Sequence, residues 1–165
     1  MTVKNIEKDP KALTMKLTAE LDATAERAWQ LWADPRQLER WWGPPTHPAT
    51  VVDHDLTNGG RVSYFMTSPE GEKFHGWWQV LSADPPRRLE VKDGFADDSG
   101  APDDSMPVTT FVVTFDESAP GRTVMIIESR FPSLETMEQM AEMGMEEGIK
   151  EAVGQIDAIL AESTG

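Results

Sequence analysis

The last thirty or so residues constrain the fold more than any other stretch, because they carry one continuous helical pattern. Ser133 is suited to cap a helix that extends to about residue 162. Apolar side chains recur there in steps of three and four: Leu134, Met137, Ala141, Met145, Ile149, Ala152, Ile156 and Ile159. This spacing places them on one face of a single long helix. A lone helix of this kind needs a sheet to bury its apolar face.

The residues before this helix are mostly of strand type. Residues 13–21 alternate apolar and polar side chains, as a half-buried strand does. Thr24 is suited to cap a short helix over 25–32, and Asp34-Pro35 to end it and start a second over 35–41. Turn residues then separate six further expected strands, over residues 47–55, 61–68, 72–81, 87–95, 108–116 and 123–130.

This order predicts an α+β fold built on one sheet. Consecutive strands with short turns pair as an antiparallel meander, and a large sheet of this kind twists and curls. We therefore expect a curved antiparallel sheet of six to seven strands wrapped around the long C-terminal helix, with two short helices after the first strand. Residues 1–12 are predicted to form a flexible N-terminus, and residues 13–162 a single domain.

Composition limits the partners of this domain. The 165 residues carry a formal net charge of −14, which disfavours nucleic acid and anionic membrane surfaces as partners. The chain has no cysteine, which excludes disulfides, thiolate catalysis and cysteine-ligated zinc. No apolar run is long enough to insert into a membrane. We therefore expect a soluble, cytoplasmic protein.

Several motifs, in this order and spacing, resemble the activator of heat-shock-protein-90 ATPase homologue-like domain family. They are AWQLWADP (28–35), LERWWGP (38–44), NGGR (58–61), PEGE (69–72), DPPRRL (84–89) and PGRT (120–123). The family belongs to the START/birch-pollen-allergen-like superfamily, and the resemblance spans roughly residues 13–162. It implies a helix-grip fold with an internal, mostly apolar cavity that binds lipids, sterols, polyketides or other hydrophobic molecules.

Aromatic and methionine side chains are the candidates for the wall of such a cavity. Adjacent residues of a strand face opposite ways, and we expect the face with Phe74, Gly76 and Trp78 to point inward. The predicted ligand-binding residues are Trp29, Trp41, Phe65, Phe74, Trp78, Phe111, Val113, Met137, Ala141, Met145 and Ile149. Ordinary core packing is the competing interpretation of the same residues. Likewise, Gly144 and Gly148 either leave room for a ligand or permit close packing of the sheet.

The sequence shows little that would support catalysis or metal binding. His47, His54 and His75 do not converge, so we predict no metal site and no cofactor. Glu128 and Arg130 are expected to form a surface pair on the outer face. Tyr64, the single tyrosine, either offers its hydroxyl to the pocket or lies at the sheet surface. No nucleophile–base pair or phosphate-binding loop is present, so no catalytic residue is predicted.

Three functions remain as hypotheses. The preferred one is binding of a small hydrophobic molecule, such as a lipid, between the curved sheet and the C-terminal helix. The alternative is a protein-interaction module that regulates a chaperone ATPase, and a homodimer through Met140 and Met143 is a further partner prediction. The last is a cyclase or hydrolase acting in the same cavity. An enzyme of that kind requires a polar group with a shifted pKa inside the pocket.

Overall fold

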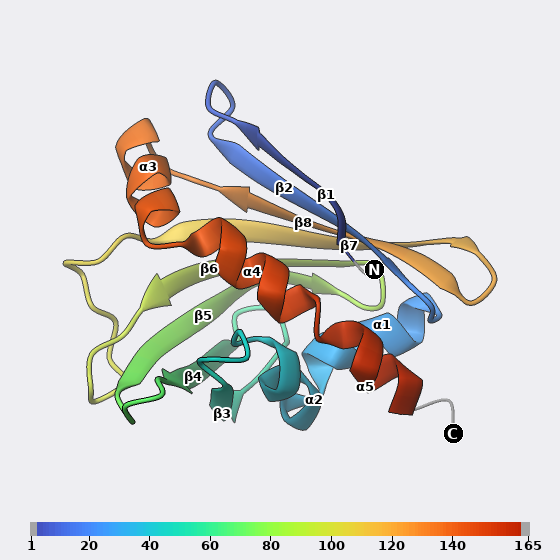
Figure 1. Cartoon of the computed structure of the whole chain (residues 1–165), viewed down its shortest axis with the longest axis horizontal. Helices are drawn as coiled ribbons and strands as arrows, with labels where there is room; N and C mark the ends of the chain where they lie inside the picture. The colour runs from blue at the N-terminus through green and yellow to red at the C-terminus, as the bar shows by residue number, and fades with distance from the viewer. Residues whose placement is uncertain (1–2, 163–165) are drawn as a thin grey trace.

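The computed structural model describes residues 3–162, which form one curved antiparallel sheet with helices on its concave side (Figure 1). The strands are β1 (Val3–Asp9), β2 (Thr14–Leu21), β3 (Ala49–His54), β4 (Arg61–Thr67), β5 (Lys73–Asp84), β6 (Arg88–Phe95), β7 (Thr109–Ala119) and β8 (Arg122–Arg130). The helices are α1 (Ala25–Ala33), α2 (Pro35–Trp41), α3 (Leu134–Glu142), α4 (Met145–Val153) and α5 (Ile156–Glu162). The order of strands across the sheet is β1-β2-β8-β7-β6-β5-β4-β3. This arrangement confirms the predicted α+β fold and is consistent with a helix-grip architecture.

The core lies between the concave face of the sheet and the helices. Alternation along the strands puts every second side chain into it: Leu17 on β2, Val91 on β6, and Val113 on β7 are fully buried. Phe111 and Phe115 on β7 and Met125 and Ile127 on β8 are buried as well. The strands therefore form a continuous apolar surface on which the helices pack.

Local capping sets the two short helices at one end of this core. The Thr24 hydroxyl accepts a hydrogen bond from the backbone N–H of Arg27, and the Asp34 carboxylate accepts one from Arg36. Asp34 ends α1 and caps α2, while Pro35 occupies the first turn of α2. These helices carry three of the six tryptophans, Trp29, Trp32 and Trp41, into the core, and Trp42 follows directly after α2. The two-helix prediction is thus confirmed, although the helices follow the second strand rather than the first.

The C-terminal helical region is not one unbroken helix, so this part of the prediction is wrong. Gly144 has a left-handed backbone (φ 83°) and separates α3 from α4, and Gly154 and Gln155 separate α4 from α5. Figure 1 shows α4 and α5 crossing the concave side of the sheet, with α3 turned away from their line. A left-handed residue cannot continue a right-handed helix. No helix within residues 3–162 is long and apolar enough to cross a membrane.

The N-terminal segment differs from the flexible stretch that was predicted for residues 1–12. Val3–Asp9 form β1, which pairs antiparallel with β2 and brings the sheet to eight strands instead of six or seven. Residues 1 and 2 lie outside the described part of the chain. Only Val3 and Ile6 of this strand pack against the core. An edge strand with so few apolar residues has a weak alternation pattern, which explains why the sequence did not indicate it.

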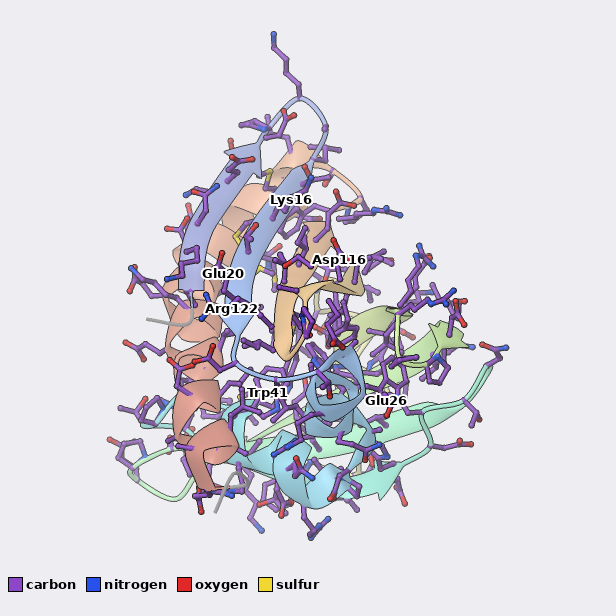
Figure 2. All side chains as sticks on the ribbon, turned by 90° about the vertical axis from the view of Figure 1, so that its right-hand side faces the viewer. Lys16, Glu20, Glu26, Trp41, Asp116 and Arg122 are labelled. Atoms are coloured by element: carbon purple, nitrogen blue, oxygen red, sulfur yellow. The ribbon has the colours of Figure 1, made fainter. Side chains whose placement is uncertain are left out.

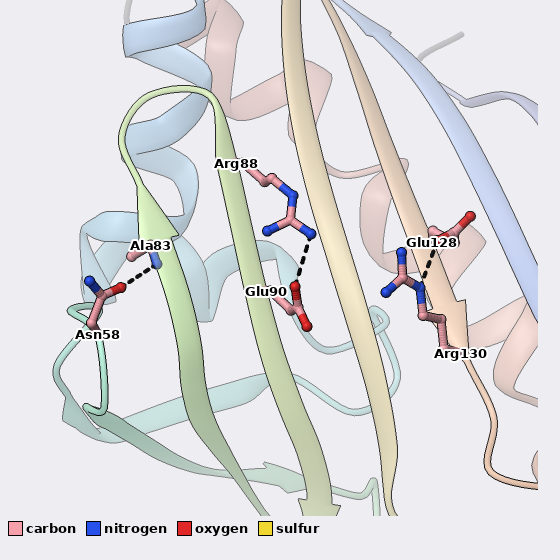
Figure 3. A network of polar contacts seen from close by, with 6 residues as sticks. All are labelled: Asn58, Ala83, Arg88, Glu90, Glu128 and Arg130. Carbon is pink, nitrogen blue, oxygen red and sulfur yellow. Dashed lines mark hydrogen bonds and ion pairs between the residues drawn. The ribbon is translucent and has the colours of Figure 1, made fainter.

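The convex face of the sheet carries ion pairs within β6 and within β8, on either side of β7 (Figure 3). Arg130 and Glu128 pair at 2.8 Å on β8, and Arg88 and Glu90 pair at 2.9 Å on β6. The first pair confirms the expectation that Glu128 and Arg130 form a surface contact. The amide oxygen of Asn58 accepts a hydrogen bond from the backbone N–H of Ala83 and ties the turn before β4 to β5.

Candidate ligand-binding pocket

A pocket of about 510 Å³ opens between one end of the concave sheet face and the junction of α3 with α4. Strands β4 to β8 form its floor, α4 forms one wall, and the loop between α2 and β3 forms the other. Its apolar lining includes Trp42, Phe74, Phe95, Phe111, Met140 and Met145. Phe74 and Met143 are half exposed, because they lie at its mouth. The predicted location of a cavity, between the sheet and the C-terminal helical region, therefore contains a pocket.

Four of the eleven residues proposed for the wall line this pocket: Phe74, Phe111, Met145 and Ile149. The others are placed elsewhere. Trp29, Trp41, Trp78 and Val113 are buried in the main core, and Met137 is buried in a smaller cluster with Met15 and Phe131. For these five residues, core packing describes the structure better than a pocket wall does.

Phe65 and Ala141 neither line the pocket nor join the buried core. The ring of Phe65 packs against the ring of His75, with 5.5 Å between centroids, and the Lys73 ammonium lies 4.7 Å from its centre. Its neighbour Tyr64 faces inward, so alternation directs Phe65 outward. Ala141 is exposed on α3. The break at Gly144 changes the phase of the helical stripe, so Ala141 no longer shares a face with α4.

The two glycines of the helical region leave open space. A Cβ atom built on Gly144 or on Gly148 would meet no atom within 4 Å, and both residues line the pocket. Of the two interpretations that the sequence left open, the geometry supports room for a ligand over close packing. Two adjacent methionines, Met143 and Met145, flank Gly144, and their flexible side chains suit a surface that adapts to its occupant.

Alanine substitutions at these two glycines are expected to have opposite effects on stability. Gly148→Ala adds a side chain without a clash inside α4, so it should raise the free energy of unfolding by about 1 kcal/mol. Gly144→Ala puts a Cβ on a residue with a left-handed backbone. This substitution should lower the free energy of unfolding by roughly 1–2 kcal/mol. Urea denaturation of both variants measures the difference. Destabilisation by Gly148→Ala would show that the space beside α4 is filled.

The floor of the pocket carries polar side chains between its apolar ones. Four side chains on four strands line it: Tyr64 on β4, Asp93 on β6, Thr109 on β7 and Ser129 on β8. Strand register explains their proximity, since Asp93 pairs with Thr109, and Phe111, two residues further along β7, pairs with Ser129. A ligand in this pocket would thus meet apolar walls and a row of oxygen atoms at the base.

Asp93 and Tyr64 form the central contact of this floor. The Tyr64 hydroxyl donates to the Asp93 carboxylate at 3.4 Å, which is long for a bond between two oxygens. Burial raises the pKa of Asp93 from its ordinary 3.8 to about 7, and the contact with Tyr64 acts weakly in the opposite direction. Burial, followed by the charge of Asp93, also raises the pKa of Tyr64 well above its ordinary value. The carboxyl group therefore changes its charge near neutral pH.

Aromatic neighbours hold the Tyr64 hydroxyl in place. The rings of Trp42 and Trp78 both lie 6.1 Å from the Tyr64 ring, and their N–H groups favour the ionised hydroxyl. Neither N–H makes a well-formed hydrogen bond within the described residues. Gly76 lies directly beneath the Tyr64 ring. A Cβ atom at this position would come within 2.5 Å of that side chain, so only glycine leaves room for it. The glycine thus lets the ring lie flat across β5 and reach Asp93.

Sequence reasoning did not identify Asp93 and favoured the sheet surface for Tyr64. The signal that could have placed them is the alternation of inward-facing and outward-facing residues along each strand. Leu89 and Val91 are fully buried, and two more residues along β6 lead to Asp93 on the same face. Val62, also fully buried, similarly places Tyr64 on the inner face of β4. A charged residue in phase with a buried apolar pair indicates a polar group inside a pocket.

A second hollow, of about 420 Å³, lies between α5 and the strands β1, β2 and β8. It is lined largely by charged residues that pair with one another. Arg122 contacts Glu20 at 3.9 Å and Asp22 at 2.9 Å, and Lys4 contacts Glu20 at 4.0 Å. Figure 2 shows Glu20 and Arg122 beside each other on neighbouring strands. This hollow shares no lining residue with the pocket described above. Because its charges satisfy each other, this hollow offers little to a ligand.

Comparisons with known proteins agree with the fold and with the resemblance. The solution structure of a protein from Arthrobacter aurescens is 52% identical, with a TM-score of 0.93, over 98% of this chain and 93% of that chain. The crystal structure of a protein from Mycobacterium smegmatis is 46% identical, with a TM-score of 0.89, over 98% of this chain and 99% of that chain. The solution structure of a protein from Staphylococcus epidermidis is 26% identical, with a TM-score of 0.83, over 97% of this chain and 95% of that chain.

A search of curated proteins found no match. The sequence profile described as Activator of Hsp90 ATPase homolog 1-like protein matches residues 22–161, which include both short helices, the pocket floor and all of α3 and α4. The match covers most of the chain and confirms the resemblance drawn from the motifs. The chain belongs to the Activator of Hsp90 ATPase homolog 1-like protein family.

Proposed function

We propose that this protein binds a small, mainly apolar molecule in the pocket between the concave sheet face and α4. The observation that supports this most directly is the pocket itself, with apolar walls, a polar floor and a volume of about 510 Å³. Ligand sites in proteins commonly have volumes of roughly 300–1,000 Å³ and combine apolar walls with a few polar groups. The smaller hollow near α5 is lined mostly by charged residues, of which Lys4, Glu20, Asp22 and Arg122 pair with one another.

The driving force of such binding is the removal of apolar surface from water. Each Å² of apolar surface removed from water contributes about 25 cal/mol before the cost of association. The pocket already has room beside Gly144 and Gly148, so no core side chain must move to admit a ligand. Exposed Phe74 and Met143 at the mouth would become covered when a ligand enters.

Filling the pocket from α4 tests this proposal. The probe is N-phenyl-1-naphthylamine, an uncharged dye at neutral pH whose emission rises in apolar surroundings. Wild-type protein should show a saturable rise in emission. Gly148→Leu should weaken dye binding by about tenfold or more, because the new side chain occupies the free space. The control is Lys150→Leu, which adds the same side chain at an exposed position of α4.

The outcomes separate pocket binding from adsorption at the surface. Loss of binding in Gly148→Leu together with normal binding in Lys150→Leu supports the proposal. Equal binding by both variants would place the dye elsewhere, and an absence of any emission change in the wild type would contradict the proposal for this probe.

Asp93 bears on the enzymatic alternative. A cyclase or hydrolase in this cavity requires a polar group with a shifted pKa, and the Asp93 carboxyl, with a pKa of about 7, meets that requirement. Catalysis in this cavity, an alternative left open by the sequence, therefore stays a second candidate function, and Asp93 is the residue that we infer for it. The regulation of a chaperone ATPase, suggested by the family name, has no corresponding feature among the described residues and also stays a prediction.

A further inference from the structure

The ionisable groups around the pocket are unbalanced in charge. Carboxyl groups line it from two sides: Asp93 from the floor, and Glu147 and Glu151 from α4. Within the described chain, no lysine or arginine lines it. The remaining ionisable lining residues are Tyr64 on β4, His75 on β5 and His47 in the loop before β3. An occupant of this pocket therefore meets three carboxyl groups and no lysine or arginine among the described lining residues.

The carboxylate of Asp93 lacks strong partners. Its one hydrogen bond with a described residue is the long contact from Tyr64 at 3.4 Å. A carboxylate accepts up to about four hydrogen bonds, so most of its capacity is unused. The Nε1 atoms of Trp42 and Trp78 are buried from solvent, so these N–H groups are not available to a ligand. A ligand that reaches the floor thus finds an acceptor and has to supply a donor.

The walls beside Asp93 are aromatic and favour a positive charge on that donor. The Trp42 ring lies 5.9 Å from the Phe111 ring and 6.1 Å from the Tyr64 ring. Ring faces attract cations, and the attraction grows where water is excluded. The chain's net charge of −14 also attracts cations from solution and repels anions. The acidic side chain at the floor, the aromatic walls and the net charge of the chain therefore all favour a ligand with a positive charge.

We propose that the pocket selects hydrophobic amines, with the ammonium on Asp93 and the apolar part along Trp42 and Phe111, over alcohols and carboxylic acids of the same skeleton. This inference rests on the proposed binding function and specifies the chemistry of its ligand. An ammonium supplies up to three donors and a charge to a carboxylate that has one long contact. A carboxylic acid would bring a second negative charge into the same apolar space.

The selection depends on pH in a defined direction. Burial holds the pKa of Asp93 near 7, so the carboxyl is neutral in mildly acidic solution and ionised above neutrality. An alkylammonium keeps its charge well above pH 7. The affinity for an amine should therefore rise as pH increases through 7, and the affinity for an alcohol should change much less. Glu147 and Glu151 on α4, Tyr64 and His47 also line this pocket, as does His75 of β5, whose ring packs against Phe65, so a variant of Asp93 is needed to isolate its part.

Three naphthalene probes with different head groups test the selection. They are 1-naphthylmethylamine, 1-naphthalenemethanol and 1-naphthoic acid, each titrated as a competitor of N-phenyl-1-naphthylamine. At about pH 8 the amine should bind roughly ten- to a hundredfold more tightly than the alcohol, the gain expected of a charged hydrogen bond. The acid should bind most weakly. Asp93→Asn should lower the affinity for the amine to that for the alcohol, and it should leave the affinity for the alcohol unchanged.

A matched variant and the pattern of failure keep the result interpretable. Asp116→Asn removes one negative charge from an exposed position of β7, and should retain the preference for the amine. Equal binding of amine and alcohol by the wild type, or a preference that survives in Asp93→Asn, overturns the inference and leaves the binding function standing. Failure of the dye and all three probes to bind overturns both.

Discussion

Replacing Asp93 with asparagine is expected to stabilise the protein by an amount that grows with pH, from near zero below pH 4 to at most about 4 kcal/mol above pH 7. Each unit of pKa shift corresponds to about 1.4 kcal/mol, and burial shifts the pKa of Asp93 from 3.8 to about 7. The value is an upper bound, because Asp93 is partly accessible through the pocket and water screens its charge.

The direction follows from counting protons in the two states. Between pH 3.8 and about 7, the folded protein holds a proton on Asp93 that the unfolded chain has released. The free energy of unfolding therefore falls as pH rises through this range, and it stays reduced above it. Asparagine has no proton to lose, and its amide oxygen still accepts the hydrogen bond from Tyr64. The wild type should thus lose stability relative to the variant across this range.

Urea denaturation of both proteins at about pH 4, 6 and 8 measures this difference. Asp116→Asn, exposed on β7 and labelled in Figure 2, controls for the loss of one negative charge. Its effect should remain within about 0.5 kcal/mol at each pH. A constant difference between wild type and Asp93→Asn at all three values would contradict the buried position of the Asp93 carboxyl.

Trp32→Ala is expected to lower the free energy of unfolding by about 3–5 kcal/mol. Trp32 is fully buried and lies at the centre of the aromatic cluster. Its ring is 4.8 Å from that of Trp41 and 5.9 Å from those of Trp42, Trp78 and Phe111. The substitution removes contacts to all four rings and leaves a cavity. Because Trp42 and Phe111 also line the pocket, binding of the apolar dye should weaken too.

Two phenylalanine substitutions separate the packing of these rings from their hydrogen bonds. The Trp41 N–H donates to the carbonyl oxygen of Leu31 at 2.9 Å, whereas the Trp32 N–H has no hydrogen-bond partner among the described residues. Trp41→Phe should therefore lower the free energy of unfolding by about 1–3 kcal/mol more than Trp32→Phe does, since it leaves the carbonyl oxygen of Leu31 without this donor. Equal costs in urea denaturation would show that this hydrogen bond contributes nothing.

The sequence predicted the elements that have strong periodicity or clear caps. Alternation and turn residues located β2 to β8, Thr24 and Ser133 cap their helices as expected, and the chain breaks between α1 and α2 at Asp34. It did not predict the breaks near Gly144 and Gly154, because glycine permits a left-handed backbone without requiring one. Tertiary packing makes that choice. The Gln155 amide, for example, donates to the backbone oxygen of Gly43 at 2.7 Å and anchors the second break to the end of α2.

The site was predicted in part, for related reasons. Phe74, Phe111, Met145 and Ile149 follow from alternation and from the helical stripe. The buried tryptophans were assigned to the wall because a sequence pattern gives the face of a residue but not its depth. Asp93 was missed because charged residues are usually exposed, so its phase within β6 was not considered. The polar floor arises from register across four strands, which a single sequence does not specify.

Backbone amide chemical shifts during titration with N-phenyl-1-naphthylamine test the central claim most directly. If the pocket above Asp93 is the ligand site, the largest changes should occur at the lining residues of α4 and of β4 to β8, including Tyr64, Asp93 and Gly148. The charged hollow around Glu20 and Arg122 should remain unchanged. Changes centred on that hollow, or spread evenly over the convex face of the sheet, would contradict the claim.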